Sequence, residues 1–299
     1  MKRQCPDPEC LTRNPSPIPG PCVRIGRYFR SSDGQWIQRY LCRRCKKSFS
    51  SATGLPTFGQ KKRQLNHLLD RLFNSNVTQR RAARLLGINR KTAVRKFRLM
   101  AAQSRVQHDQ WLEELASRPL SFVQFDDLET SEHTKCKPLS VALAVDPKSR
   151  KILGFQVSSM PAKGHLAAIA RRKYGFRPDQ RAQGWDALFR SLRPVVCPDA
   201  EFLSDQNPHY PEFLRRHFPN ANHRTVKGRR GCVAGQGELK KGGFDPLFSL
   251  NHTCAMLRAN LSRLIRRTWC TTKTQQGLID HLSLYVRYHN RVLTSACTL

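Results

Sequence analysis

Acidic side chains are scarce in this sequence. Its 299 residues contain 21 aspartates and glutamates against 53 lysines and arginines, which gives a formal net charge of +32. A chain with so large an excess of one sign repels itself unless it meets a polyanion. Nucleic acid fits this charge best, because each phosphate that a cation neutralises releases condensed counterions. We therefore expect a nucleic-acid-binding protein, with a ribosomal or chromatin-like protein as the plainest alternative.

Long apolar runs are missing as well. No uninterrupted apolar stretch approaches the ~20 residues that a membrane-spanning helix needs, so we expect no role in a membrane. The first residues, MKRQC, lack the apolar stretch of a secretory signal. Because export is not expected, the eleven cysteines are interpreted as thiols and metal ligands rather than as disulfides. These features favour a cytoplasmic protein.

Four cysteines form two close pairs near the N-terminus. Cys5 and Cys10 flank Pro-Asp-Pro-Glu, and Cys42 and Cys45 flank two arginines. A tetrahedral Zn²⁺ site takes four soft ligands, and tight turns deliver them two at a time. A segment with so few aliphatic residues would depend on the metal for its folding energy. Cys22 is either an alternative to Cys10 as a ligand or a spare thiol.

The residues between the two cysteine pairs have the pattern of a β-hairpin. Residues 23–28 and 36–41 are typical of short strands, and Ser-Ser-Asp-Gly at 31–34 is typical of the turn between them. Together with the cysteines, this hairpin predicts a zinc ribbon over residues 1–52.

Residues 60–105 change to a helical pattern. Four leucines at 65, 68, 69 and 72 form one apolar stripe. Thr78 and Asn89 are typical helix N-caps, and Gly87 fits a left-handed helix terminus. The order of helix, tight turn and second helix is that of a helix-turn-helix, whose second helix reads a major groove.

The second of these helices is rich in basic side chains. Five of them are expected on its exposed face: Arg90, Lys91, Arg95, Lys96 and Arg98. We expect Arg90, Lys91 and Arg95 to contact DNA. A solvated basic helix pair that does not enter a groove is the alternative.

Residues 118–299 have the pattern of a sheet flanked by helices. Three β-rich runs predict antiparallel strands: 122–129, 139–145 and 152–157. Further elements are expected after them: helices near 164–172 and 178–192, strands at 201–205 and 222–226, and an amphipathic helix over 250–269. This order is typical of an α/β domain.

Two aspartates stand near the ends of strands in this domain. Asp126 closes the first predicted strand and Asp205 the fourth. Carboxylates on neighbouring strands can hold two Mg²⁺ ions about 4 Å apart across a scissile phosphate. In so basic a chain, two such acids would be costly neighbours without a cation. Ordinary solvated acids at strand ends are the alternative.

Four segments resemble the transposases of the insertion-sequence-one superfamily, including their relatives with an N-terminal zinc ribbon. The resemblance runs in order over nearly the whole chain, and its last segment is the most specific. The segments are residues 39–50, Phe125-Asp126-Asp127-Leu128, Leu203-Ser204-Asp205 and residues 257–273. In these enzymes the catalytic domain is ribonuclease H-like, and Mg²⁺ assists strand cleavage and strand transfer at element ends.

The resemblance implies a multidomain α/β protein with a zinc ribbon, a helix-turn-helix and a ribonuclease H-like mixed sheet with flanking helices. It implies a DDE-type transposase that binds double-stranded DNA, namely the terminal repeats of a mobile element and its target. Such enzymes act as homodimers or larger homo-oligomers, and this one is expected on the nucleoid of a prokaryote. A zinc-ribbon and helix-turn-helix regulator with a degenerate, inactive nuclease-like domain is the alternative.

The resemblance also implies the catalytic residues. Asp126 and Asp205 would hold Mg²⁺ or Mn²⁺, and the third acid of the superfamily falls on Asn251, whose amide oxygen can still bind a hard cation. Arg258 lies about two helical turns later, so it shares a face with Asn251 and can meet the same phosphate. Glu238 is the rival third ligand. We prefer Asn251, because Glu238 lies in a Gly- and Lys-rich stretch typical of a loop.

Overall fold

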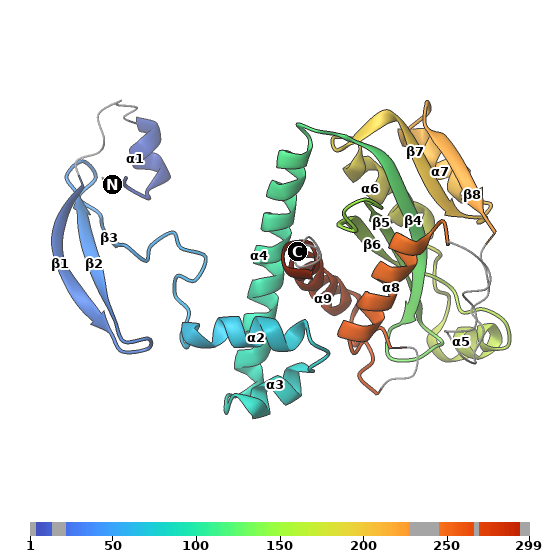
Figure 1. Ribbon diagram of the computed structural model, residues 1–299. Coiled ribbons are helices and arrows are strands. Elements are labelled where there is room, and N and C mark those ends of the chain that lie inside the picture. The colour runs from blue at the N-terminus through green and yellow to red at the C-terminus, as the bar shows by residue number, and fades with distance from the viewer. Residues whose placement is uncertain (1–3, 14–21, 228–244, 266–268, 294–299) are drawn as a thin grey trace. The chain divides into compact units, whose positions relative to one another are not determined.

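The computed structural model describes residues 4–13, 22–227, 245–265 and 269–293 (Figure 1). Its contacts divide the chain into two compact units, which we call the N-terminal unit (Met1–Leu68) and the C-terminal unit (Leu69–Leu299). Among the described residues, no helix combines the length and the apolar character that crossing a membrane requires.

The N-terminal unit contains an antiparallel sheet with the strand order β1-β2-β3. Its elements are α1 (Pro8–Arg13), β1 (Cys22–Arg30), β2 (Gln35–Cys42), β3 (Ser48–Ser50) and the 3₁₀ helix η1 (Arg63–Leu65). At the β1–β2 turn, Arg30 Nε donates to Asp33 Oδ1 at 2.7 Å, and Gly34 has a φ of 68°. The hairpin predicted between the two cysteine pairs is confirmed.

Three helices follow: α2 (Asn66–Phe73), which crosses from one unit into the other, α3 (Gln79–Leu85) and α4 (Arg90–Leu115). The side chain of Thr78 accepts a hydrogen bond from the backbone N–H of Arg81 at the start of α3. The side chain of Asn89 accepts one from the backbone N–H of Lys91 at 2.8 Å, at the start of α4. Gly87, between the two helices, has a φ of 59°. Both predicted caps and the left-handed glycine are confirmed. We call α3 and α4 the helix pair.

The C-terminal unit is centred on a five-stranded mixed sheet with the order β6-β5-β4-β7-β8. The strands are β4 (Leu120–Ser131), β5 (Pro138–Val145), β6 (Ile152–Ser159), β7 (Val196–Asp205) and β8 (Asn222–Val226). The first three pair antiparallel, as predicted. Strands β7 and β8 are parallel to β4, which lies in the middle of the sheet.

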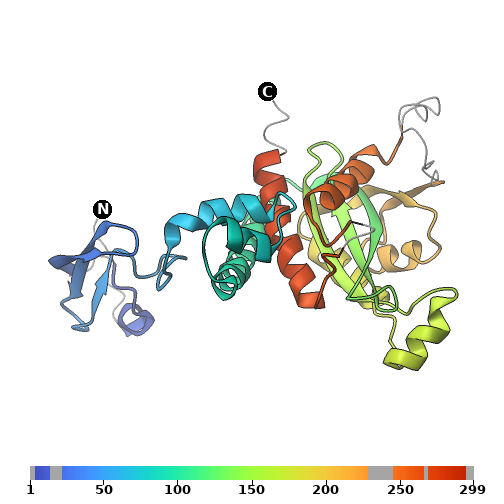
Figure 2. The same ribbon diagram turned by 90° about the horizontal axis from the view of Figure 1, so that it is seen from below.

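Helices cover both faces of this sheet (Figure 2). On one face lie α8 (Phe248–Asn260) and α9 (Gln275–Tyr288), and on the other α6 (Arg181–Leu192) and α7 (Tyr210–His217). Trp185 and Phe189 of α6 are buried in the core between this helix and the sheet. Helix α9 also packs along α4, so it lies between the sheet and the long helix. Two elements remain: α5 (Leu166–Tyr174) and the π-helical turn η3 (His289–Leu293).

The long helix predicted over residues 250–269 is wrong in its second half. Helix α8 ends at Asn260, because Leu261 has an extended backbone with a φ of −113°. Leu261 and Leu264 are nevertheless buried in the same core as Leu257. The apolar spacing therefore reflected burial, which continues through the turn after the helix has ended.

Candidate functional site

The four paired cysteines of the N-terminal unit come together in the structure. The sulfur atoms of Cys5, Cys10, Cys42 and Cys45 all lie within 4.8 Å of one another. Cys5 Sγ is 3.6 Å from Cys45 Sγ, and Cys10 Sγ is 3.8 Å from Cys42 Sγ. Four sulfurs about 2.3 Å from a tetrahedral zinc ion would be separated by about 3.8 Å. The residues present therefore fit a metal ion of this kind.

Local backbone geometry prepares the second cysteine pair for metal binding. Cys42 accepts a backbone hydrogen bond from Lys46 at 2.9 Å and donates one to Lys47 at 3.0 Å, which folds Cys42 and Cys45 into a tight turn. Burial opposes ionisation of the Cys42 thiol, but hydrogen bonds from the backbone of Cys45 and Arg44 outweigh it and lower its pKa to about 6. Cysteine binds metal as the thiolate, so Cys42 is the thiol best prepared to ligate.

Cys22 packs against the cluster without being one of the four. Burial raises the pKa of its thiol to about 11. Of the two alternatives that the spacing left open, the geometry favours Cys10 as the ligand.

In the C-terminal unit, the parallel pairing of β4 and β7 brings the two predicted aspartates together. Gln124 of β4 is in register with Leu203 of β7, and two residues further along each strand stand Asp126 and Asp205. Burial, and next the charge of Asp205, raise the pKa of Asp126 to about 6. A bound cation would relieve both effects, since it replaces lost solvation and neutralises the repulsion.

Two donors fix the carboxylate of Asp126. The hydroxyl of Tyr210 donates to Oδ1 at 3.1 Å, and the backbone N–H of Asp127 donates to the same oxygen at 2.6 Å. Asp205 is held by the backbone N–H of Asn207, which donates to its Oδ1 at 3.1 Å. Nothing in the sequence indicates the role of Tyr210, which comes from a helix that the periodicity did not predict.

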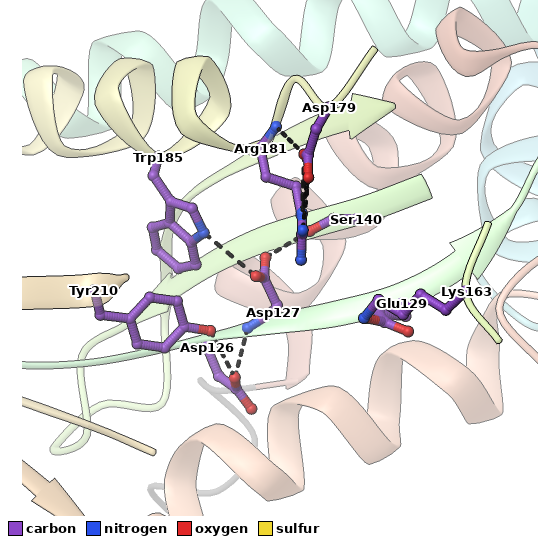
Figure 3. A network of polar contacts seen from close by, with 9 residues as sticks. All are labelled: Asp126, Asp127, Glu129, Ser140, Lys163, Asp179, Arg181, Trp185 and Tyr210. Carbon is purple, nitrogen blue, oxygen red and sulfur yellow. Dashed lines mark hydrogen bonds and ion pairs between the residues drawn. The ribbon is translucent and has the colours of Figure 1, made fainter. Parts of the chain in front are cut away.

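Asp127 points to the opposite side of β4 from Asp126 (Figure 3). Its carboxylate accepts hydrogen bonds from Ser140 Oγ at 2.6 Å and from Trp185 Nε1 at 3.3 Å. Burial raises its pKa, against the effect of these two donors. The adjacent acids therefore have different environments, and only Asp126 faces the helix that carries Asn251.

That helix, α8, is fixed to β4 by the side chain of Gln124. Its Nε2 donates to the carbonyl of Pro246 at 2.8 Å, and its Oε1 accepts from the N–H of Leu250 at 3.1 Å. Gln124 is buried, and it lies two residues before Asp126 on the same face of the strand. The first turn of α8 is thereby held beside the aspartates.

Asn251 and Arg258 both lie on α8. The side-chain nitrogen of Asn251 donates to Asp245 Oδ2 at 2.8 Å, a bond that does not use the amide oxygen, the atom suited to a cation. One turn further along α8, burial and next the charge of Asp126 raise the pKa of the Cys254 thiol to about 12, an effect that Arg258 opposes. Carboxylate and amide oxygens are the kind of ligand that hard cations take. Glu238 lies outside the described residues.

The basic residues predicted to contact DNA lie at the start of α4. Arg90, Lys91 and Arg95 are exposed, and so is Arg98. Lys96 does not share this face, since it is buried with 5% of its surface exposed. The expectation that Lys96 would be exposed is therefore wrong, because α4 turns this side chain toward the interior of the C-terminal unit.

Comparison with known proteins adds no family name, because no family model and no curated protein matches this chain.

Proposed function

We propose that this protein is a DDE-type DNA transposase with the catalytic set Asp-Asp-Asn. It would bind the terminal repeats of a mobile element and catalyse Mg²⁺-dependent strand cleavage and strand transfer. The observation that carries the proposal is the position of Asp126 beside Asp205 on adjacent parallel strands. The chain has many more basic than acidic side chains, which could have paired with these two aspartates. The fold instead brings the two acids together on neighbouring strands, where their charges repel each other.

The topology supports a ribonuclease H-like assignment for the sheet. Three antiparallel strands are followed by two that run parallel to β4. Strand β4 comes first in the chain among these five and lies at the centre of the sheet. Asp126, in the middle of β4, and Asp205, at the end of β7, then fall on neighbouring strands, as the resemblance to insertion-sequence-one transposases implies. The four clustered cysteines support a zinc ribbon, and the capped helix pair with its exposed arginines supports a helix-turn-helix.

The side chains around the acids suggest how the reaction is organised. Asp126, Asp205 and the amide oxygen of Asn251 would hold Mg²⁺ or Mn²⁺. When bound, two such ions activate the attacking hydroxyl and stabilise the leaving oxygen of the phosphate. Tyr210 would keep Asp126 in one orientation, and Arg258 would contact a phosphate oxygen. Arg90, Lys91 and Arg95 would hold the DNA through the helix pair.

The experiment that tests this proposal is strand cleavage on DNA taken from both sides of the protein's own coding region. Wild-type protein is expected to nick or join this DNA only when Mg²⁺ or Mn²⁺ is present. Asp205→Asn should abolish cleavage and leave DNA binding intact, because the helix pair is elsewhere in the fold. Asp199→Asn is a matched control, since Asp199 is an exposed acid on the same strand.

Full cleavage by Asp205→Asn would overturn the proposal. Wild-type protein that binds these sequences tightly and never cleaves them would instead favour a DNA-binding regulator with an inactive nuclease-like domain.

A further inference from the structure

The exposed start of α4 forms one wall of a groove whose other wall comes from a distant part of the chain. The groove has a volume of about 730 Å³ and lies within the C-terminal unit. Its first wall is the helix pair, and its second is formed by residues 262–263 and 269–273, which lie between α8 and α9. Seven described lining residues are cationic and none is acidic; the cations are Arg80, Arg90, Lys91, Arg95, Arg98, Arg263 and Lys273.

The second wall is attached at both of its ends. At the end of α8, the carbonyl of Asn260 accepts a hydrogen bond of 2.8 Å from the N–H of Asn76, in the loop before α3. At the other end, Thr272 is fully buried and its carbonyl accepts a hydrogen bond of 2.8 Å from the N–H of His133. The loop before α3 and the residues just after β4 thus hold the two ends of this part of the chain in place.

Trp269, on the second wall, is fully exposed, with 100% of its surface accessible. A tryptophan in this position leaves a large apolar ring in water, which is unfavourable for the isolated protein. An exposed ring in a groove lined by cations has the two features of a site for unpaired nucleic acid. The cations follow the phosphates, and the flat ring stacks on a base. An acidic protein surface would match the positive charge of the groove but would not provide the flat base on which the Trp269 ring can stack.

We propose that this groove is a DNA-binding site, in which the helix pair contacts a duplex and Trp269 stacks on an unpaired base next to it. Lys273 contacts a phosphate beside that base. The proposal extends the proposed function by assigning a second DNA-contacting segment. It rests on DNA binding by the helix pair but not on catalysis, so it can be tested without cleavage.

The test is the affinity of the full, zinc-loaded chain for a fluorescein-labelled duplex with a single-stranded extension, measured by anisotropy without added Mg²⁺ or Mn²⁺. Trp269→Ala should weaken binding about tenfold, since stacking on one base contributes on that scale. Trp269→Phe should retain most of the affinity. Phe176→Ala is the matched control, because Phe176 is an exposed aromatic at 82% in the same unit, outside this groove, and its loss should change nothing.

Two further measurements separate stacking from charge. Without the extension, the blunt duplex should show a smaller difference between wild-type protein and Trp269→Ala. The salt dependence should be unchanged in Trp269→Ala, and its slope should fall by about one in Lys273→Ala.

Wild-type affinity in Trp269→Ala, together with a loss in Arg90→Ala, would overturn this proposal and leave DNA binding by the helix pair in place. Equal losses in Trp269→Ala and Phe176→Ala would also overturn it. Loss of cleavage alone, with these affinities as expected, would count only against the catalytic proposal.

Discussion

The hydroxyl of Tyr210 donates a hydrogen bond to the same oxygen of Asp126 that accepts the backbone N–H of Asp127. Tyr210 is itself buried, with 1% of its surface exposed, and burial raises its pKa, so the hydroxyl remains a donor at neutral pH. Both donors engage Oδ1 and thus set the direction in which the carboxylate presents Oδ2.

Tyr210→Phe should therefore weaken catalysis while preserving the fold. We expect about tenfold lower cleavage and a higher Mg²⁺ concentration for half-maximal activity, as when a partner that orients a metal ligand is removed. Tyr285→Phe is the control, because it also removes a buried hydroxyl, which bonds with Asn260 instead. An unchanged Mg²⁺ dependence in Tyr210→Phe would mean that the tyrosine serves packing alone.

Asn251 is expected to tolerate change better than the two aspartates, because it contributes no charge. Asn251→Ala should reduce cleavage roughly a hundredfold if its amide binds the cation. Asn251→Glu restores the third acid that the resemblance to insertion-sequence-one transposases implies, and it should retain activity. Glu238→Gln should have little effect. Cleavage lost in Glu238→Gln and kept in Asn251→Ala would identify Glu238 as the third ligand.

Metal analysis of the full chain should give one zinc ion per molecule. Replacing Cys42 and Cys45 together by serine should remove it, since two of the four sulfur ligands are lost. Cys197→Ser should retain the metal, because Cys197 belongs to the sheet of the C-terminal unit. Zinc that persists in the double variant would show that other side chains bind it.

Replacement of Arg90 and Lys91 by alanine tests whether the helix pair reads sequence. Binding to the DNA beside the coding region should fall far more than binding to random duplex, because only base contacts discriminate between them. Replacement of Lys148, which is exposed elsewhere in the C-terminal unit, should affect neither. Equal losses on both DNAs, with a flatter salt dependence, would indicate phosphate contacts alone.

Acid should destabilise the C-terminal unit through His281. This side chain is buried, its Nε2 donates to the carbonyl of Phe73 at 2.9 Å, and burial lowers its pKa to about 4. The unfolded chain takes up the proton near pH ~6.5, so the free energy of unfolding falls as the pH drops from there through the folded pKa. The loss should reach about 3 kcal/mol at ~1.4 kcal/mol per pH unit.

Denaturant unfolding at several pH values measures this effect. His281→Gln should flatten the dependence between about pH 6.5 and pH 4, whereas His165→Gln, at an exposed position, should leave it unchanged. A wild-type stability that is constant over this range would contradict the prediction.

The sequence predicted those features whose causes are local. Cysteine spacing, the Ser-Ser-Asp-Gly turn and the caps Thr78 and Asn89 each act over a few residues, and the structure has them. Tyr210 was missed because its partner, Asp126, is 84 residues away in sequence. Lys96 was misplaced because the side of α4 that faces inward depends on its packing with α9, an element that was not predicted. Long-range pairing decided both cases.

The two bonds of Gln124 have a mechanical consequence. One amide bonds both to the carbonyl of Pro246, just before α8, and to the N–H of Leu250 in its first turn, so sliding of the helix along β4 would strain both bonds. These bonds couple the start of α8 to β4. Under the proposed function, a load that DNA places on Arg258 would therefore pass along α8 to the strand that carries Asp126.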